Sequence, residues 1–232
     1  MQRVRAVLRR RGMSATATVA LLWLGFAGSH LVLSSLPVRR PLVAAVGAQA
    51  FQGLYSLVAL GFFVPLVWFY FRHKHAGDWL WGVARTTSVV WAIDAGMTVA
   101  FVLLVAALVR PSPAAVVPGD PTPRGVYRLT RHPLLMAFVL FGLLHLVVNS
   151  STADVAFFGG FVVFALVGAW HQDRRKLALG TPGFARFYAE TPFLPLPRSG
   201  ALQGLVETPP AVFAAGLVLT VLVRQLHRYW TG

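Results

Sequence analysis

The chain of 232 residues contains no cysteine, which excludes a disulfide framework, an iron–sulfur cluster and a thiol nucleophile within it. Charged residues are also scarce, at 12% of the chain, and only seven residues are acidic. Apolar residues, by contrast, make up 56%, and the mean hydropathy is +0.66. This composition is typical of an integral membrane protein and not of one or two soluble domains.

The shortage of acidic residues leaves a formal net charge of +14. In a soluble protein such a charge would point to nucleic acid. Here most Lys and Arg residues stand between apolar runs, where anionic lipid headgroups explain them better. We therefore expect membrane lipid as a partner and no nucleic acid.

Long apolar runs predict an all-α, polytopic helical membrane protein with five to six transmembrane helices in a single membrane domain, 1–232. About 20 apolar residues in a helix cross the bilayer core. The link 150–152 is so short that the fourth and fifth spans must form a tight antiparallel hairpin. The expected spans are Ala15–Leu36, Phe51–Phe71, Ser88–Val109, Pro133–Asn149, Ala153–Trp170 and the shorter run Ala211–Val223.

Three further segments are distinguished by their composition. Residues 1–14 are basic and precede an apolar run, as in a signal peptide, but that run is too long for one and is expected to be a retained span. Residues 171–208 form a basic, amphipathic segment, which either lies on the membrane surface or covers a cofactor site. Residues 209–232 form either a final short span or an interfacial helix.

Two histidines fall inside predicted spans, His30 in the first and His145 in the fourth. Ionisable residues are costly in a membrane and are functional candidates by default. Neutral imidazole is a common metal ligand. At helical spacing Phe138 and Phe141 could flank a flat aromatic ligand beside His145, with Gly142 leaving it room. The alternative is a histidine hydrogen-bonded to a neighbouring helix.

Arg131 and His132 precede Pro133 at the start of the fourth span, at the border between water and lipid. A histidine in this position could bind a phosphate or carboxylate, cap a helix, ligate a metal or simply lie among headgroups. His171, at the end of the fifth span, is a further candidate ligand. The residues alone leave these alternatives open.

Four stretches within residues 28–197 resemble the NnrU family of bacterial membrane proteins and their plant relatives, the 15-cis-zeta-carotene isomerases. They are SHLVLSSLPVRRPL, FQGLYSLVAL, RLTRHPLLMAFVLFGLLHLVVN and GAWHQDRRK. The resemblance implies haem b, with His30 and His145 as iron ligands. From their positions in the sequence we also expect Phe138, Phe141, His132 and Arg131 at the cofactor site. The resemblance also implies redox-linked cis–trans isomerisation of a hydrophobic polyene, or a role in nitric oxide metabolism and denitrification, in the bacterial inner membrane.

A wider resemblance is to the isoprenylcysteine carboxyl methyltransferases, through the RHP motif and the segment GFARFYAETPFLP. It implies an S-adenosylmethionine pocket, open to solvent, around Arg131, His132, Asp173 and Tyr188. The chain departs from that pattern where a Glu pair is expected, because Gln172 and Asp173 stand there. A membrane methyltransferase is thus one alternative function. A non-enzymatic haem or nitric oxide sensor is another.

Overall fold

The structure is a computed structural model that describes residues 13–115, 119–195 and 199–231. Most of the basic segment 1–14 lies outside these ranges. Within them the chain is all-α and has no β-strand. The elements are α1 (Ala15–Ser34), α2 (Leu36–Val46), α3 (Ala48–Arg72), α4 (Thr87–Val109), the 3-10 turn η1 (Gly125–Arg128), α5 (Pro133–Val148), α6 (Thr152–Ala178), α7 (Phe184–Glu190), α8 (Ala201–Glu207) and α9 (Pro210–Thr231).

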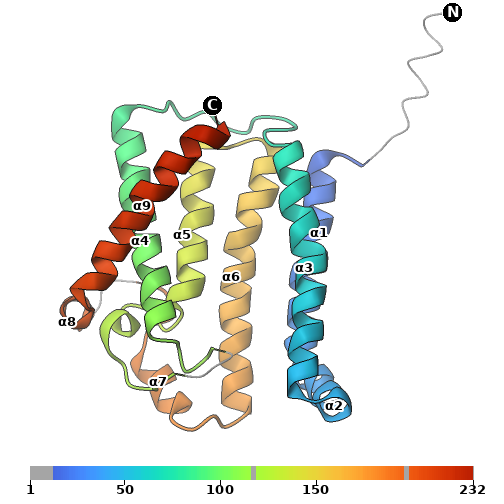
Figure 1. Ribbon diagram of the computed structural model, residues 1–232, viewed down its shortest axis with the longest axis vertical. Helices are drawn as coiled ribbons and strands as arrows, with labels where there is room; N and C mark the ends of the chain where they lie inside the picture. Colours follow the sequence, from blue (N-terminus) through green and yellow to red (C-terminus); the bar gives the residue numbers. More distant parts are fainter. Residues whose placement is uncertain (1–12, 116–118, 196–198, 232) are drawn as a thin grey trace, which may run out of the picture.

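Among the described residues, five helices are long and apolar enough to cross a membrane: α1, α3, α4, α6 and α9. The apolar helix α5 is shorter, at 16 residues. The predicted polytopic helical membrane fold is therefore confirmed. The last helix has 22 residues, more than its apolar run suggested, and lies alongside α4 (Figure 1).

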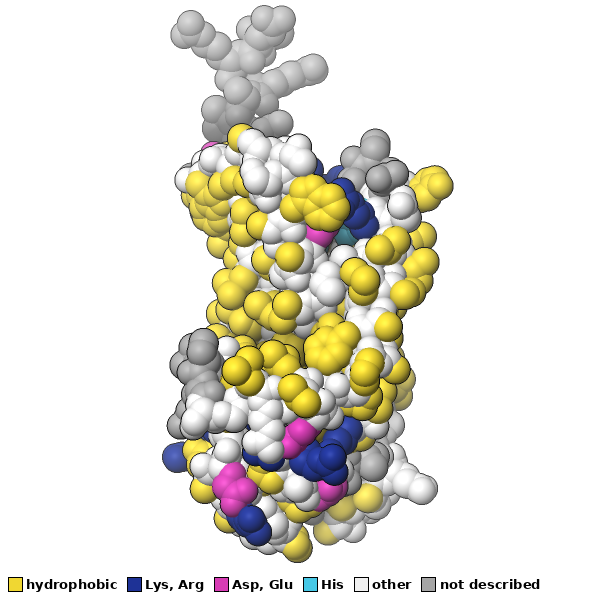
Figure 2. Space-filling model, turned by 90° about the vertical axis from the view of Figure 1, so that its left-hand side faces the viewer, with side chains coloured by type: hydrophobic (Ala, Val, Ile, Leu, Met, Phe, Trp, Pro, Cys, Tyr) yellow, Lys and Arg dark blue, Asp and Glu magenta, His cyan; other side chains and the backbone are white. Residues whose placement is uncertain are grey.

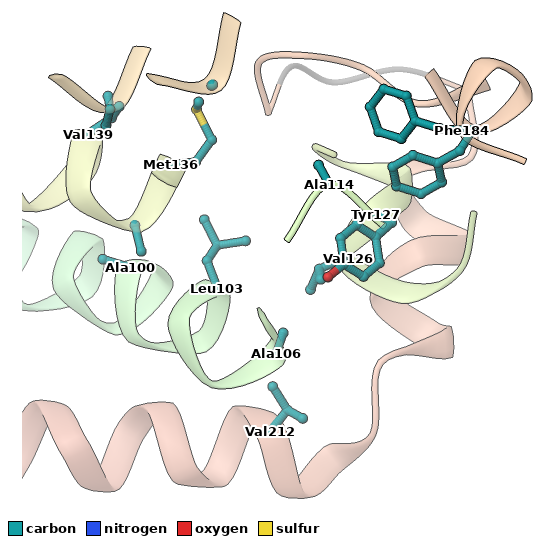
Figure 3. Close-up of a cluster of buried hydrophobic side chains, with 14 residues drawn as sticks. Ala100, Leu103, Ala106, Ala114, Val126, Tyr127, Met136, Val139, Phe184 and Val212 are labelled. Carbon is teal, nitrogen blue, oxygen red and sulfur yellow. The ribbon is translucent and has the colours of Figure 1, made fainter. Parts of the chain in front are cut away.

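Helix α6 is the centre of the bundle (Figure 1). On one side it packs against α5, which contacts α4, which in turn contacts α9; on the other side it packs against α1, which contacts α3. Figure 3 shows Leu103 of α4 between Met136 of α5 and Val212 of α9, within one of the two apolar clusters. The predicted hairpin is confirmed, because α5 ends at Val148 and α6 begins at Thr152.

Much of the apolar surface faces outward. Trp68 is 58% exposed and Leu108 is 68% exposed. Figure 2 shows an apolar band around the middle of the α4 and α9 side, with charged side chains toward the two ends. A soluble monomer rarely exposes so large an apolar area, whereas lipid would cover it in a membrane.

One expected loop is helical. The sequence predicts that Pro37 ends the first span and that Arg39 and Arg40 begin a loop, but these residues belong to α2. The backbone is extended only at Ser35, with ψ 142°. Proline lacks an N–H and suits the first turn of a helix, so Pro37 starts α2 after the break. As a result Arg39 comes to face α3.

The basic segment 171–208 is not one surface helix. Its first part, to Ala178, continues α6, and α7 and α8 follow as short helices of seven residues each. Gly180 and Gly183 have positive φ between α6 and α7, which turns the chain back toward the start of α5. This return brings Thr191 to the RHP motif, which Asp173 of α6 also contacts.

Candidate functional site

The structure forms a cavity of about 330 Å³, mainly between α1, α2, α3 and α6, near the end of the bundle where α2 lies. This volume is at the lower end for small-molecule sites. Aromatic side chains, including Phe51 and Phe164, form part of its wall. Its polar lining comprises His30, Ser34, Gln52, Tyr55, His171 and Gln172 and the three basic residues Arg39, Arg175 and Lys176.

His30 lines this cavity from α1. Its Nδ1 lies 3.1 Å from the carbonyl oxygen of Phe26, one turn earlier. A carbonyl can only accept, so Nδ1 carries the proton and Nε2 keeps its lone pair. The ring centroid lies 4.8 Å from that of Tyr55 and 5.3 Å from that of Phe164. His30 therefore presents a metal-ligand nitrogen among aromatic side chains.

His171 lines the same cavity from α6. Its Nε2 lies 3.0 Å from Oγ of Ser34, a residue one turn beyond His30 on α1. This hydrogen bond joins α1 to α6 across the cavity. It also engages Nε2, one of the two ring nitrogens through which a histidine can bind a metal.

His145 lies elsewhere, on α5, and does not line the cavity. Its Nδ1 lies 2.8 Å from the carbonyl oxygen of Phe141, so its Nε2 also keeps a lone pair. Its ring stacks on Phe158 at 4.7 Å, and that of His227 from α9 lies 6.2 Å away. His30 and His145 thus share a local geometry but not a cavity.

Phenylalanine side chains lie between these two histidines. His30 contacts Phe164 of α6, Phe141 beside His145 packs on Phe161 of α6 at 5.1 Å, and α6 separates α1 from α5. The two histidines therefore contact different phenylalanines of α6, Phe164 and Phe158, and their pairing as ligands stays a prediction. Among the described residues, no three His, Asp or Glu side chains come together as a metal site.

The space expected beside Gly142 is filled by α6. A Cβ atom at Gly142 would come within 2.6 Å of the carbonyl oxygen of Phe158, so this glycine lets the two helices approach closely. Phe141 packs against Phe158 and Phe161, and the half-exposed Phe138 lies 6.1 Å from Phe161. These residues serve helix packing here and line no part of the cavity around His30.

Arg131 and His132 form a third, separate cluster with Asp173 of α6. His132 Nε2 lies 2.9 Å from one carboxylate oxygen of Asp173, and Arg131 Nε donates to the other at 2.8 Å. All three side chains are buried. Arg131 also donates to the carbonyl of Thr191, and its guanidinium lies 4.2 Å from the ring centre of Tyr188.

This buried cluster brings together the four residues that the methyltransferase resemblance named. The expected solvent-open pocket is not formed by these residues, because both oxygens of Asp173 are engaged and His132 is only 3% exposed. The segment after α6 does cover His132, through Phe193. What it encloses there is the ion pair of Arg131 with Asp173, and not a pocket for a cofactor. We interpret Arg131, His132 and Asp173 as a structural clamp between α5, α6 and the segment after α7.

A fourth cluster was not found from the sequence. Asp154, in the first turn of α6, is fully buried and accepts hydrogen bonds from Tyr70 Oη at 2.8 Å and His75 Nδ1 at 2.9 Å. Ser151 and Asp154 also form a capping box. The Ser-x-x-Asp spacing before an apolar run was the available signal. This cluster joins α3 to the hairpin at the end of the bundle opposite the cavity.

Outside the spans, Glu207 at the end of α8 holds η1. Arg128 donates two hydrogen bonds to its carboxylate and the Gly125 N–H donates a third. These donors, Arg128 first, lower the pKa of Glu207 from 4.5 to about 2. The stabilisation is thus present above pH 4.5 and is lost as the pH falls toward about 2.

Glu207→Gln should therefore lower the melting temperature at pH 6, and the gap from the wild type should close as the pH falls from 4.5 to about 2. Thermal melts in detergent, followed by circular dichroism, measure this difference in melting temperature. Glu190→Gln is the control, because its pair with Arg186 is exposed. A gap that does not depend on pH would contradict the assignment.

Comparison with known proteins gives one family and two relatives. A family model described as "NnrU protein" matches residues 18–232. The chain is 25% identical over 185 residues to the chloroplastic 15-cis-zeta-carotene isomerase of Zea mays, covering 78% of this chain and 50% of that protein. For the protein of the same name from Arabidopsis thaliana, identity is 27% over 165 residues, covering 70% and 44%.

The chain thus spans about half the length of the curated relatives it matches. No solved structure matches the chain.

Proposed function

Because this chain belongs to the NnrU family, we propose that it is a membrane protein that binds haem b and catalyses an isomerase-like reaction on a hydrophobic polyene. The observation that carries the proposal is the imidazole of His30. Its ring lines a cavity within a bundle of apolar helices, and its Nδ1 donates to a backbone carbonyl, which leaves Nε2 with its lone pair. The names of the two plant relatives support the polyene as the substrate class.

The residues around His30 fit haem in their chemistry. An imidazole nitrogen suits iron, aromatic side chains suit the faces of a macrocycle, and basic side chains suit its carboxylates. We propose His145 as the second ligand, because its Nε2 is also free. Ligation of one iron by both would require the phenylalanines between them to move. Haem iron supplies a redox couple and a Lewis acid whose strength its axial ligands set.

The chain's own contribution is to surround this chemistry with apolar side chains. Exclusion of water from the bundle would protect a bound polyene and strengthen electrostatic interactions at the site. Nitric oxide stays a second proposed ligand, because it would bind to the same haem iron. The bacterial inner membrane also stays a prediction, since the curated relatives are named as chloroplastic proteins.

A visible absorption spectrum of the detergent-purified protein tests the proposal. Protein from haem-replete cells should show a Soret band that shifts on reduction. Added nitric oxide should shift it again if the iron has an exchangeable ligand, which would favour the nitric oxide role. A colourless protein from haem-replete cells would refute haem binding.

A further inference from the structure

The cavity around His30 contains three basic side chains and no acidic one. Arg39 reaches it from α2, and Arg175 and Lys176 reach it from the last turns of α6. Arg39 and Arg175 are close enough to interact electrostatically with Lys176. Like charges brought together in a partly dry site repel one another, so this arrangement costs stability when the cavity holds no anion.

No acidic residue of the chain is available to balance these charges. All seven lie within the described ranges, and none lines the cavity. Asp78 is exposed near the start of α6, at the other end of that helix. The other six are paired elsewhere: Asp94 with Arg224, Asp120 with Arg110, Asp154 with His75, Asp173 with Arg131, Glu190 with Arg186 and Glu207 with Arg128.

Arg175 and Lys176 are partly or fully withdrawn from solvent, and one of their donors lacks a partner. The Nε of Arg175 is buried and has no hydrogen-bond partner in the described part of the chain. Lys176 is only 8% exposed as a residue, although its ammonium is not among the buried groups that lack a partner. A buried donor at a charged group is costly when it is left unsatisfied. The Nε of Arg175 is therefore a donor that an anion bound in the cavity would satisfy.

An apolar groove adjoins the basic cavity. It has a volume of about 230 Å³ and lies between the end of α1, α2 and the start of α3. Phe51 and Tyr55 line both spaces, so the groove and the cavity lie next to each other at these two side chains. The other side chains of the groove are aliphatic: Leu33, Leu42, Val46, Leu54 and Val58.

We propose that Arg39, Arg175 and Lys176 bind the anionic carboxylate or phosphate group of an amphipathic molecule, whose apolar part occupies the adjoining groove. Guanidinium groups match the oxygens of carboxylates and phosphates in geometry as well as charge. A lipid headgroup and the carboxylates of haem offer the same chemistry. The site goes beyond the proposed function and does not depend on haem being bound.

Thermal melts of the full chain in dodecyl maltoside test the proposal with paired probes. Oleate is compared with oleyl alcohol, which has the same apolar chain without the charge, and haemin is compared with its dimethyl ester. Oleate should raise the melting temperature, and the shift should grow with the logarithm of its concentration above the Kd, because a ligand that binds the folded state stabilises it. Oleyl alcohol should not. A preference for haemin over its ester would add haem carboxylates as a second source of the anion.

Arg175→Gln and Lys176→Gln should each weaken oleate binding about tenfold to a hundredfold, the range expected for losing a charge-assisted hydrogen bond. The ligand-free melting temperature of Arg175→Gln should equal or exceed that of the wild type, since a buried repulsion is removed. Arg174→Gln is the matched control. It removes the same charge one residue away, where the guanidinium is exposed over Trp170.

An equal loss of oleate binding in Arg174→Gln would overturn the proposal, because bulk charge would then explain it. Unchanged binding in Arg175→Gln would also overturn it, as would inorganic phosphate binding as tightly as oleate. A colourless protein that still discriminates oleate from oleyl alcohol would refute the proposed function and support this site. The two proposals can thus fail separately.

Discussion

Replacing His30 by alanine should abolish the Soret band of the protein purified from haem-replete cells. His30 lines the cavity, and its Nδ1 donates to the Phe26 carbonyl, so its Nε2 keeps the lone pair that a metal needs. Axial imidazoles both retain haem iron and set its spin state, so alanine at this position should remove haem and not only shift the band. The measurement is the ratio of haem to protein, by absorption and pyridine haemochrome, in matched preparations.

His145→Ala should lose the haem or its low-spin spectrum in the same way. His73→Ala is the matched control, because its Nδ1 also bonds a carbonyl one turn earlier, that of Phe69 at 2.9 Å, but its ring is exposed. His171→Ala should keep the band, since Ser34 engages its Nε2. Loss of haem in His171→Ala, with retention in His145→Ala, would make His171 the second ligand and refute the assignment of His145.

Replacing Asp173 by alanine should lower the free energy of unfolding by about 3–5 kcal/mol, the range for removing one partner of a buried ion pair. The change removes the carboxylate that pairs with Arg131 and hydrogen-bonds His132 Nε2, and both residues are buried. It should also loosen the segment after α7, which Arg131 holds through the Thr191 carbonyl. Denaturant titration of the detergent-solubilised protein measures the loss.

The control for this variant is Asp78→Ala, which removes an exposed carboxylate and should change the free energy of unfolding by less than about 0.5 kcal/mol. The double variant Arg131→Met, Asp173→Leu should recover part of the loss, because removing both charges is less costly than stranding one. If Asp173→Ala were as stable as the control, the clamp would not be a structural element.

Several features of the fold could be predicted from sequence because they depend on short stretches of chain. A helix that crosses the bilayer needs a long apolar run, and the runs at 15–36, 51–71, 88–109 and 153–170 overlap α1, α3, α4 and α6. The three-residue link forced the hairpin of α5 and α6. The N-cap residues Thr86 and Ser151 stand directly before the helices they cap, where a local pattern can find them.

The candidate site was less accessible to such reasoning. The sequence singled out His30 and placed it near the end of the first span, and that residue does line the cavity. It did not connect Arg39 with Arg175, because 136 residues separate them and Arg39 was expected in a loop. It assigned Arg131 and His132 to a cofactor, because RHP alone does not show that Asp173 would form hydrogen bonds with both.

What the sequence determined by itself is the class of the protein: an all-α membrane chain without cysteine, with its apolar runs in order and few acidic residues. Which side of each helix meets its neighbour was decided by tertiary structure alone. In a soluble helix the apolar stripe marks the buried side, but lipid is as apolar as a protein core, so α1, α3 and α5 carry no such stripe. Packing details such as the close approach at Gly142 then set helix rotation, and that rotation separates His145 from His30 and gathers Arg39, Arg175 and Lys176 around one cavity.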